Sequence, residues 1–196
     1  MHIITISREY GAGGHTIGKR VAAELGIEFY DKDIIRSAVR DTGLESETVE
    51  REEEEISRAD VIWRWITPAA YTDRREAIHE IESRAILLFA SKGPCVIVGR
   101  CADTILEEAN IEALNVFIHA DDIHRAVRVS ELIGSKNPND IQRAMKRHDS
   151  ARHSYYQQFT GKHWGLAKNY NLCLDSGLLG YDACVRLICE AARNEK

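Results

Sequence analysis

A glycine-rich loop between an apolar segment and a helical pattern constrains this chain more than any other feature. Residues 2–6 are rich in β-branched side chains, as expected of a short buried strand. Gly11, Gly13 and Gly14 follow, and apolar residues then recur at helical spacing until Gly26, a residue that favours the end of a helix. A strand, a glycine loop and a helix in this order open an α/β fold with a parallel sheet.

The glycine loop is placed where anions bind, because free backbone N–H groups and the positive end of the helix dipole point at such a loop. The literal phosphate-loop pattern fits Gly13 to Lys19, but Arg20 then replaces the expected serine or threonine. That register also places the Lys19 amine a turn inside the helix. Aligning residues 11–13 with the glycines of a phosphate loop instead puts Gly14 where the loop lysine belongs. A tight turn without a ligand is the alternative interpretation.

The loop therefore lacks the lysine that normally neutralises the β- and γ-phosphates during phosphoryl transfer. Arg8, Lys19 or an arginine from a lid would have to replace that charge, or the chain binds a nucleotide without fast turnover. The hydroxyl of Thr16 is suited to donate to an α- or β-phosphate. His15 stands where a small residue often lets magnesium approach.

The rest of the chain continues the α/β pattern. Further strands are expected at 27–30, 95–98, 114–119 and 170–174. Further helices are expected after Asp31 or Asp33, after Asp121 or Asp122, and over 141–158 and 181–193. Between them, 45–75 predicts a helical insertion. A helix over 75–91 would return to the sheet, with its packed face at Ala77, Ile81, Ala85 and Leu88.

Composition narrows the function classes. Hydrophobic residues make up 44% of the 196 residues, enough for the core of one domain. The net charge of −5 argues against a duplex-DNA binder, and leaves nucleic-acid binding through the basic stretch 143–168 as a weak alternative. No apolar run is long enough to span a membrane, and the start has no signal-peptide pattern. Five cysteines without metal-ligand spacing predict reduced thiols in a cytoplasmic protein.

A basic segment in the second half of the chain has the features of a lid. Arg125 and Arg128 share a helical face, and Arg147 and Arg152 follow beyond a loop expected at 134–140. Phosphoryl transfer needs positive charge around the migrating group, and arginines beside a mobile loop supply it on closure. A solvated basic helix surface is the alternative for each of these side chains.

Two other groups in this region have two interpretations each. Asp149 either orients Arg147 and Arg152 or is a plain surface charge. An aromatic group either packs in the core, which we favour, or stacks on a base: Tyr155, Tyr156, Phe159 and Trp164.

Taken together, these motifs resemble those of nucleoside monophosphate kinases. The segment GAGG follows a short strand, FYD ends at Asp31, VGR ends at Arg100, and FIHA precedes Arg125 and Arg128. The closest resemblance is to the divergent cytidylate kinase-like family that carries SREYG-[AS]-GG at the loop, and it extends from residue 2 to about residue 190. It implies an α/β, P-loop NTPase-type three-layer fold with a central parallel sheet, formed by one domain, 1–196, with an acceptor-side insertion at 45–75 and a lid-like segment at 125–152.

The resemblance also implies roles for individual residues. Donor phosphates would be wrapped by Gly11, Ala12, Gly13, Gly14, His15 and Thr16. The acceptor would be held by Asp31, Arg36, Arg100 and Asp103. Charge for catalysis would come from Arg8, Arg100, Arg125, Arg128, Arg147 and Arg152. Cys101 replaces the aspartate of the family's glycine-arginine-aspartate motif, which puts cytosine specificity in doubt.

The function expected from the sequence is ATP-dependent transfer of a γ-phosphate to a nucleoside monophosphate, CMP- or dCMP-like, or to a related small acceptor. Mg²⁺ would come with the nucleotide, because the histidines show no metal-binding spacing. A non-catalytic nucleotide-binding or regulatory module on the same fold is the alternative, because the loop lysine is absent. We expect a small-molecule nucleotide as partner, no nucleic acid and no membrane. The insertion, with Trp63 and Trp65, is the surface on which a homo-oligomer would form.

Overall fold

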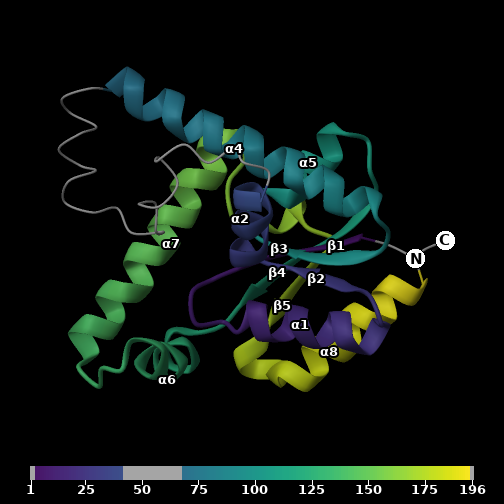
Figure 1. Ribbon diagram of the computed structural model, residues 1–196. Coiled ribbons are helices and arrows are strands. Elements are labelled where there is room, and N and C mark those ends of the chain that lie inside the picture. Colours follow the sequence, from purple (N-terminus) through teal and green to yellow (C-terminus); the bar gives the residue numbers. More distant parts are fainter. Residues whose placement is uncertain (1–2, 42–67, 195–196) are drawn as a thin grey trace.

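A five-stranded parallel sheet lies at the centre of the protein in a computed structural model that describes residues 3–41 and 68–194 (Figure 1). Its strands follow the order β2-β3-β1-β4-β5. Their bounds are β1 Ile3–Arg8, β2 Glu28–Tyr30, β3 Cys95–Val98, β4 Ala113–His119 and β5 Leu172–Asp175. All pairings are parallel, so the carboxyl ends of the strands share one edge. The expected α/β fold with a central parallel sheet is confirmed.

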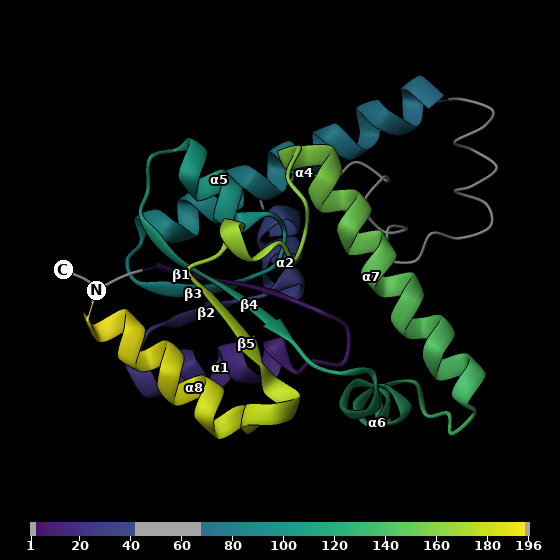
Figure 2. The ribbon, with the colours of Figure 1, turned by 180° about the vertical axis from the view of Figure 1, so that it is seen from behind.

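Helices cover both faces of the sheet and make three layers (Figure 2). Ile4 and Ile6 of β1 pack with α1 (Gly14–Leu25) and α8 (Ser176–Asn194). Ile3 points to the other face, where α4 (Pro68–Ser91) and α5 (Ala102–Glu108) lie. This alternation is the period of two that strands impose on their side chains. Because central strands are covered on both sides, β3 is apolar throughout.

Most helix boundaries follow the capping residues visible in the sequence. Gly26 ends α1 in a left-handed conformation, and Asp31 accepts the amides at the start of α2 (Lys32–Asp41). Asp121 caps α6 (Asp122–Ile133), and Asn137 caps α7 (Pro138–Thr160). A short 3-10 turn, η2 (Ala167–Asn169), precedes β5. Of the two candidates offered for each aspartate cap, Asp31 and Asp121 are therefore the ones used.

Several predicted boundaries were wrong. The loop expected at 134–140 is shorter, because Asn137 caps α7 and Pro138 fits its first turn. α4 begins at Pro68 rather than at residue 75, and α8 begins at Ser176, with a kink at Gly180. α5 was not predicted at all. Residues 42–67, which include Trp63, Trp65 and most of the predicted insertion, lie outside the described residues.

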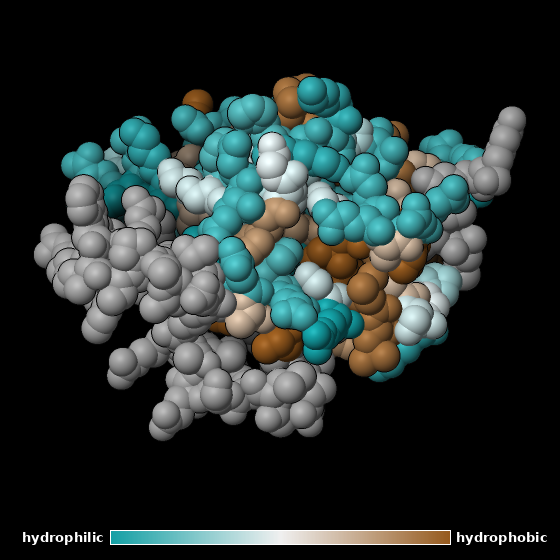
Figure 3. All heavy atoms as spheres, turned by 90° about the horizontal axis from the view of Figure 1, so that it is seen from above, coloured by the Kyte–Doolittle hydropathy of each residue, from teal (hydrophilic) through white to brown (hydrophobic). Residues whose placement is uncertain are grey.

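The packed face predicted for α4 was only partly right: Ala85 packs against the core and Ile81 is half-buried, but Ala77 is exposed. Leu88 is 53% exposed, whereas Ile86 and Phe89 are buried. Glu82, which lies four residues before Ile86 and shares its face, is buried with them. On the outer side of α4, Arg84 and Glu80 form an exposed ion pair. Figure 3 shows many hydrophilic residues on the coloured part of the face seen from above, with a hydrophobic patch among them.

α6 and α7 extend to one side of the sheet, and the later part of α7 returns to α4 (Figures 1 and 2). There Phe159 stacks on His79 at 4.0 Å between ring centres, and Tyr156 is buried. Trp164 meets Phe117 of β4 edge-on at 5.4 Å. These aromatic side chains are thus packed in the core, the interpretation that the sequence favoured.

Two further observations concern the cysteines and the apolar length of the helices. All five cysteines are unpaired, and four of them are buried. Across 3–41 and 68–194, every helix is too short or too polar to cross a bilayer.

Candidate active site

The glycine loop, residues 9–13, joins the carboxyl end of β1 to the start of α1. Gly11 and Gly13 have φ values of 87° and 77°, a region that favours glycine. A Cβ atom at Gly13 would lie 2.2 Å from the ring of Tyr181. The loop therefore needs these glycines both for its backbone path and for its close packing.

The start of α1 differs from the starts of α2, α6 and α7. Those three helices are capped by side-chain oxygens, whereas the N-cap of α1 is Gly13, without a side-chain cap, and its first turn holds no acidic residue. The first N–H groups of a helix have no partner within the helix. Together with the helix dipole they attract an anion. The residues at this end of the loop therefore fit a phosphate group.

A buried arginine contacts the glycine loop on the side where α6 and α7 meet it, which we call the underside of the loop. Arg125, 6% exposed, donates through Nε to the carbonyl oxygen of Tyr10 at 2.9 Å and lies 3.1 Å from Glu9 Oε2. It also pairs with Asp149, whose Oδ1 accepts the Tyr10 amide at 2.8 Å. A Cβ atom at Gly11 would lie 2.8 Å from the carbonyl oxygen of Arg125. The structure thus places Arg125 beneath the loop, as part of its support.

Arg152 reaches the same underside from α7. Its Nη1 donates to the carbonyl oxygen of Arg8 at 3.1 Å and lies 3.7 Å from Asp149 Oδ1. The guanidinium also lies over the ring of Tyr10, which stacks on His148. Of the two interpretations of Asp149, orientation of arginines is therefore the one that the structure favours, although its partners are Arg125 and Arg152.

Arg8 crosses from the glycine loop to the end of β3. A Cβ atom at Gly14 would lie 2.6 Å from Cβ of Arg8, and one at Gly99 would lie 2.3 Å from its Nη1. The stem of Arg8 therefore occupies the space beside Gly14, the position aligned with the missing lysine. Its guanidinium reaches the carboxyl end of the neighbouring strand.

Three consecutive residues after β3 have left-handed backbone conformations: Gly99, Arg100 and Cys101, with φ values of 82°, 60° and 55°. Such conformations are costly for residues other than glycine and concentrate at functional sites. They direct Arg100 towards α4, where its Nε lies 3.3 Å from Oε1 of Glu82. The turn therefore fixes Arg100 at the carboxyl edge of the sheet.

Glu82 is a site residue that the sequence analysis missed. It is 2% exposed, and its Oε2 accepts a hydrogen bond from the Tyr155 hydroxyl at 3.0 Å. That hydroxyl lies 2.9 Å from Nδ1 of His79, and burial raises the pKa of Tyr155 well above its usual value. The one sequence signal was the position of Glu82 four residues before Ile86, on the apolar face of the helix.

Asp103 lies on α5 with its carboxyl group buried. Tyr156 donates a hydrogen bond to its Oδ2 at 2.6 Å, and burial raises the pKa of this carboxyl above its usual value. The carboxyl group of Asp103 is thus hydrogen-bonded to a residue of α7. The role predicted for Asp103 in holding an acceptor stays a prediction.

His15 and Asp31 meet at the outer rim of the loop. Nε2 of His15 lies 2.9 Å from Oδ2 of Asp31, the residue that follows β2. The other oxygen of Asp31 accepts the amides of Asp33 and Ile34, at 3.0 Å each. Burial opposes ionisation of Asp31, but the bonds from Ile34 and His15 outweigh it and lower the pKa of this carboxyl. The pair joins the first turn of α1 to the carboxyl end of β2.

Residues 3–178 match the cytidylate kinase-like family, and this match covers most of the chain and all of the site residues above except Tyr181. The chain belongs to this family. No match is found among curated proteins.

Solved structures give the fold of this cytidylate kinase-like chain independent support. An uncharacterized protein from Eubacterium ventriosum is 24% identical, with all of both chains covered and a TM-score of 0.77. Protein TT1252 from Thermus thermophilus is 15% identical over all of both chains, with a TM-score of 0.59. Shikimate kinase from Bacteroides thetaiotaomicron is 14% identical over 98% of both chains, with a TM-score of 0.55. At these identities the likeness shows the fold alone, a P-loop kinase fold.

The remaining predicted basic residues of this cytidylate kinase-like chain lie on α1, α2, α6 and α7. Arg128 is half exposed and pairs with Glu131 of its own helix at 2.7 Å. Arg147 is exposed on α7, Lys19 is exposed on α1, and Arg36 belongs to α2. The lid-like segment thus holds two kinds of arginine: Arg125 and Arg152 bind the backbone of Tyr10 and Arg8, whereas Arg128 is half exposed and Arg147 is exposed.

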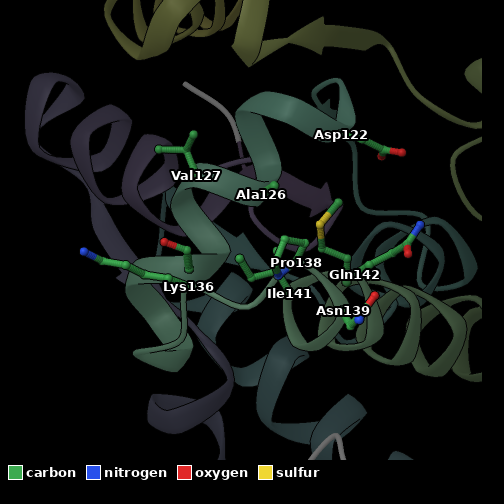
Figure 4. A pocket seen from close by; sticks show the side chains of 10 residues that line it. Asp122, Ala126, Val127, Lys136, Pro138, Asn139, Ile141 and Gln142 are labelled. Carbon is green, nitrogen blue, oxygen red and sulfur yellow. The ribbon is translucent and has the colours of Figure 1, made fainter.

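A pocket of about 550 Å³ lies between α6 and α7 (Figure 4). Its apolar lining includes Ala126, Val127, Ile141 and Met145, with Lys136 at one side. Ile141 and Met145 also pack with the buried Val129. The two helices of the lid-like segment therefore join through a small apolar core and leave an open space beside it.

Proposed function

We propose that this protein is an ATP-dependent phosphotransferase that moves the γ-phosphate to a nucleoside monophosphate, CMP- or dCMP-like, or to a related small acceptor. The observation that carries the proposal is the glycine loop, which is held rigidly from below by Arg125 and opens onto the uncapped start of α1. Rigid backbone donors at a helix start stabilise phosphate charge without reorganising during the reaction.

Backbone amides would carry most of the donor binding. The segment from Gly11 through Ala12 to Thr16 fits the phosphates of ATP, because its helix start holds no competing side-chain oxygen. Mg²⁺, arriving with the nucleotide, would neutralise part of the phosphate charge. Arg8 supplies the charge of the missing lysine, since its stem fills the space beside Gly14.

The acceptor would lie along the carboxyl edge of β2 and β3. Asp31 follows β2, Arg100 follows β3, and Arg36 and Asp103 lie on the next two helices of that edge. The exposed Arg128 and Arg147 would add charge when the lid-like segment closes over the phosphates. Positioning and charge neutralisation would then do most of the catalysis.

A second candidate is a nucleotide-binding or regulatory module without turnover. Two observations favour it: Gly14 leaves no room for a lysine against the Arg8 stem, and Cys101 replaces the acidic residue of the family motif. The two candidates share the fold and the loop, and they differ in whether ATP is consumed.

The deciding experiment incubates the full chain with Mg-ATP and a panel of monophosphates and other small acceptors, and measures ADP. Binding of ATP is followed separately by thermal shift, since a ligand of the native state raises the melting temperature by mass action. We expect ADP formation that falls about a hundredfold in Arg8→Met, which keeps the stem and removes the charge. Arg84→Ala, which removes an exposed charge on α4, is the control with unchanged turnover. ATP binding without ADP for any acceptor would favour the module instead.

A further inference from the structure

The contact between His15 and Asp31 has the geometry of a histidine held for proton transfer. The two residues are 16 apart in the chain, so the contact is made by the fold and not by local helix geometry. His15 comes from the first turn of α1, and Asp31 from the carboxyl end of β2. The pair therefore lies between the end of the proposed donor loop and the edge proposed for the acceptor.

The aspartate fixes which nitrogen of the ring holds a proton. Asp31 has a lowered pKa and is ionised at neutral pH, so it only accepts hydrogen bonds. A neutral His15 must then donate through Nε2, which leaves the lone pair on Nδ1. Within the described parts of the chain, Nδ1 of His15 makes no hydrogen bond. The ring also meets Phe29 edge-on at 5.3 Å, so its orientation is held on two sides.

The surroundings keep this nitrogen available. The side chain of His15 is 55% exposed, whereas that of Asp31 is 17% exposed and anchored by two backbone amides. Along the chain, the nearest basic residues are Lys19, one turn further along α1, and Lys32, which follows Asp31 at the start of α2. A fixed carboxylate behind an accessible imidazole is the arrangement that lets a histidine act as a base.

A base at this point is informative about the acceptor. A phosphate acceptor is already ionised and needs no group to remove a proton. An alcohol is protonated at neutral pH, and its attack is assisted by a general base. We therefore propose that His15, oriented by Asp31, is the general base of this enzyme, and that the acceptor presents a hydroxyl group. This inference rests on the proposed phosphotransferase function and narrows its acceptor class.

The proposed transfer forms one bond to the γ-phosphorus and breaks one. The acceptor hydroxyl gives its proton to Nδ1 of His15 while its oxygen forms a bond to the γ-phosphorus. The bond from that phosphorus to the bridging oxygen of the β-phosphate breaks, and ADP leaves with the electron pair. The imidazolium, stabilised by the Asp31 carboxylate, returns its proton to solvent.

A second histidine–aspartate pair in the same molecule provides a matched control. Asp121 caps α6 as Asp31 caps α2, and its Oδ2 lies 2.5 Å from Nδ1 of His124. That pair is local, three residues apart within one helix start, and both side chains are half exposed. Removal of His124 repeats the chemical change of removing His15 without touching the loop.

The test compares matched acceptors that differ in the reacting group. Cytidine and deoxycytidine present the hydroxyl where CMP and dCMP present the phosphate, and a panel of sugars and hydroxy acids extends the hydroxyl class. We expect ADP and a phosphate ester with at least one hydroxyl acceptor. In His15→Gln, kcat should fall about a hundredfold or more, and the acidic limb of the pH–rate profile should disappear. His124→Gln should keep the wild-type rate and profile.

The second variant, Asp31→Asn, separates base positioning from folding. The amide oxygen can still cap α2, but the neutral side chain no longer selects the tautomer with Nδ1 free, so kcat should fall with little change in KM for ATP. Thermal shifts with ATP should stay as in the wild type for both variants. Turnover of monophosphates without any hydroxyl acceptor overturns the base and leaves the phosphotransferase intact. ATP binding without ADP from either class overturns both. An equal loss at every pH in His15→Gln also overturns the base.

Discussion

The underside and the rim of the glycine loop use charged residues in opposite ways. Below the loop, Arg125 pairs with Glu9 and Asp149, and Arg125 and Asp149 also bind the backbone of Tyr10. At the rim, α1 starts without a cap, and His15 keeps one nitrogen available. Charge by itself therefore does not mark a reacting group in this protein. The underside supports the loop backbone, and the rim is where we propose that the ligand binds.

The largest expected effect comes from breaking the underside. Arg125→Ala leaves Glu9 and Asp149, both largely buried, without their shared cation, and removing one partner from a buried ion pair costs about 3–5 kcal/mol. Urea unfolding followed by circular dichroism should show this loss of stability. A loss below about 1 kcal/mol would mean that the underside does not support the loop in the way described.

At the rim, the expected effect is smaller and depends on pH. Asp31→Ala removes the cap of α2, which should cost about 1 kcal/mol at pH 7. The native pKa of Asp31 is lowered, so its carboxylate stabilises the fold above the unfolded value of about 3.9. That contribution is lost as the pH falls through the lower native pKa. Unfolding at pH 7 and at about pH 3 should therefore show a smaller gap between variant and wild type in acid. A gap that is constant or grows in acid would contradict the role of the ionised carboxyl.

Much of the fold was predictable because its signals are local. Asp31, Asp121 and Gly26 each fix a helix end through contacts with their own neighbours. The face of α4 was not predictable in this way. Glu82 is charged and reads as a solvent residue, yet it is buried because Arg100 and Tyr155, distant in the chain, pair with it. α5 was missed because it is short and starts after three left-handed residues.

In the candidate site, too, local motifs were predictable from the sequence, whereas contacts between distant residues were not. The loop, Asp31 and Arg100 were predicted from motifs, and the structure places all of them along the carboxyl edge of the sheet. The contact of His15 with Asp31 joins two motifs that were predicted separately, and only the fold reveals their distance of 2.9 Å.

Arg125 and Arg128 offer a direct test of the difference between buried and exposed charges. They lie three residues apart on one helix and looked equivalent in the sequence. Arg128 is half exposed, and its partner Glu131 remains solvated without it. Exposed ion pairs contribute little, so Arg128→Ala should change the free energy of unfolding by less than about 0.5 kcal/mol. The same urea titration measures it beside Arg125→Ala. A large loss would show that α6 depends on charges along its whole length and that burial does not separate its two arginines. A small one, accompanied by lower turnover, would mean that one helix carries a structural arginine and a functional arginine a single turn apart, and that the direction each side chain faces decides which is which.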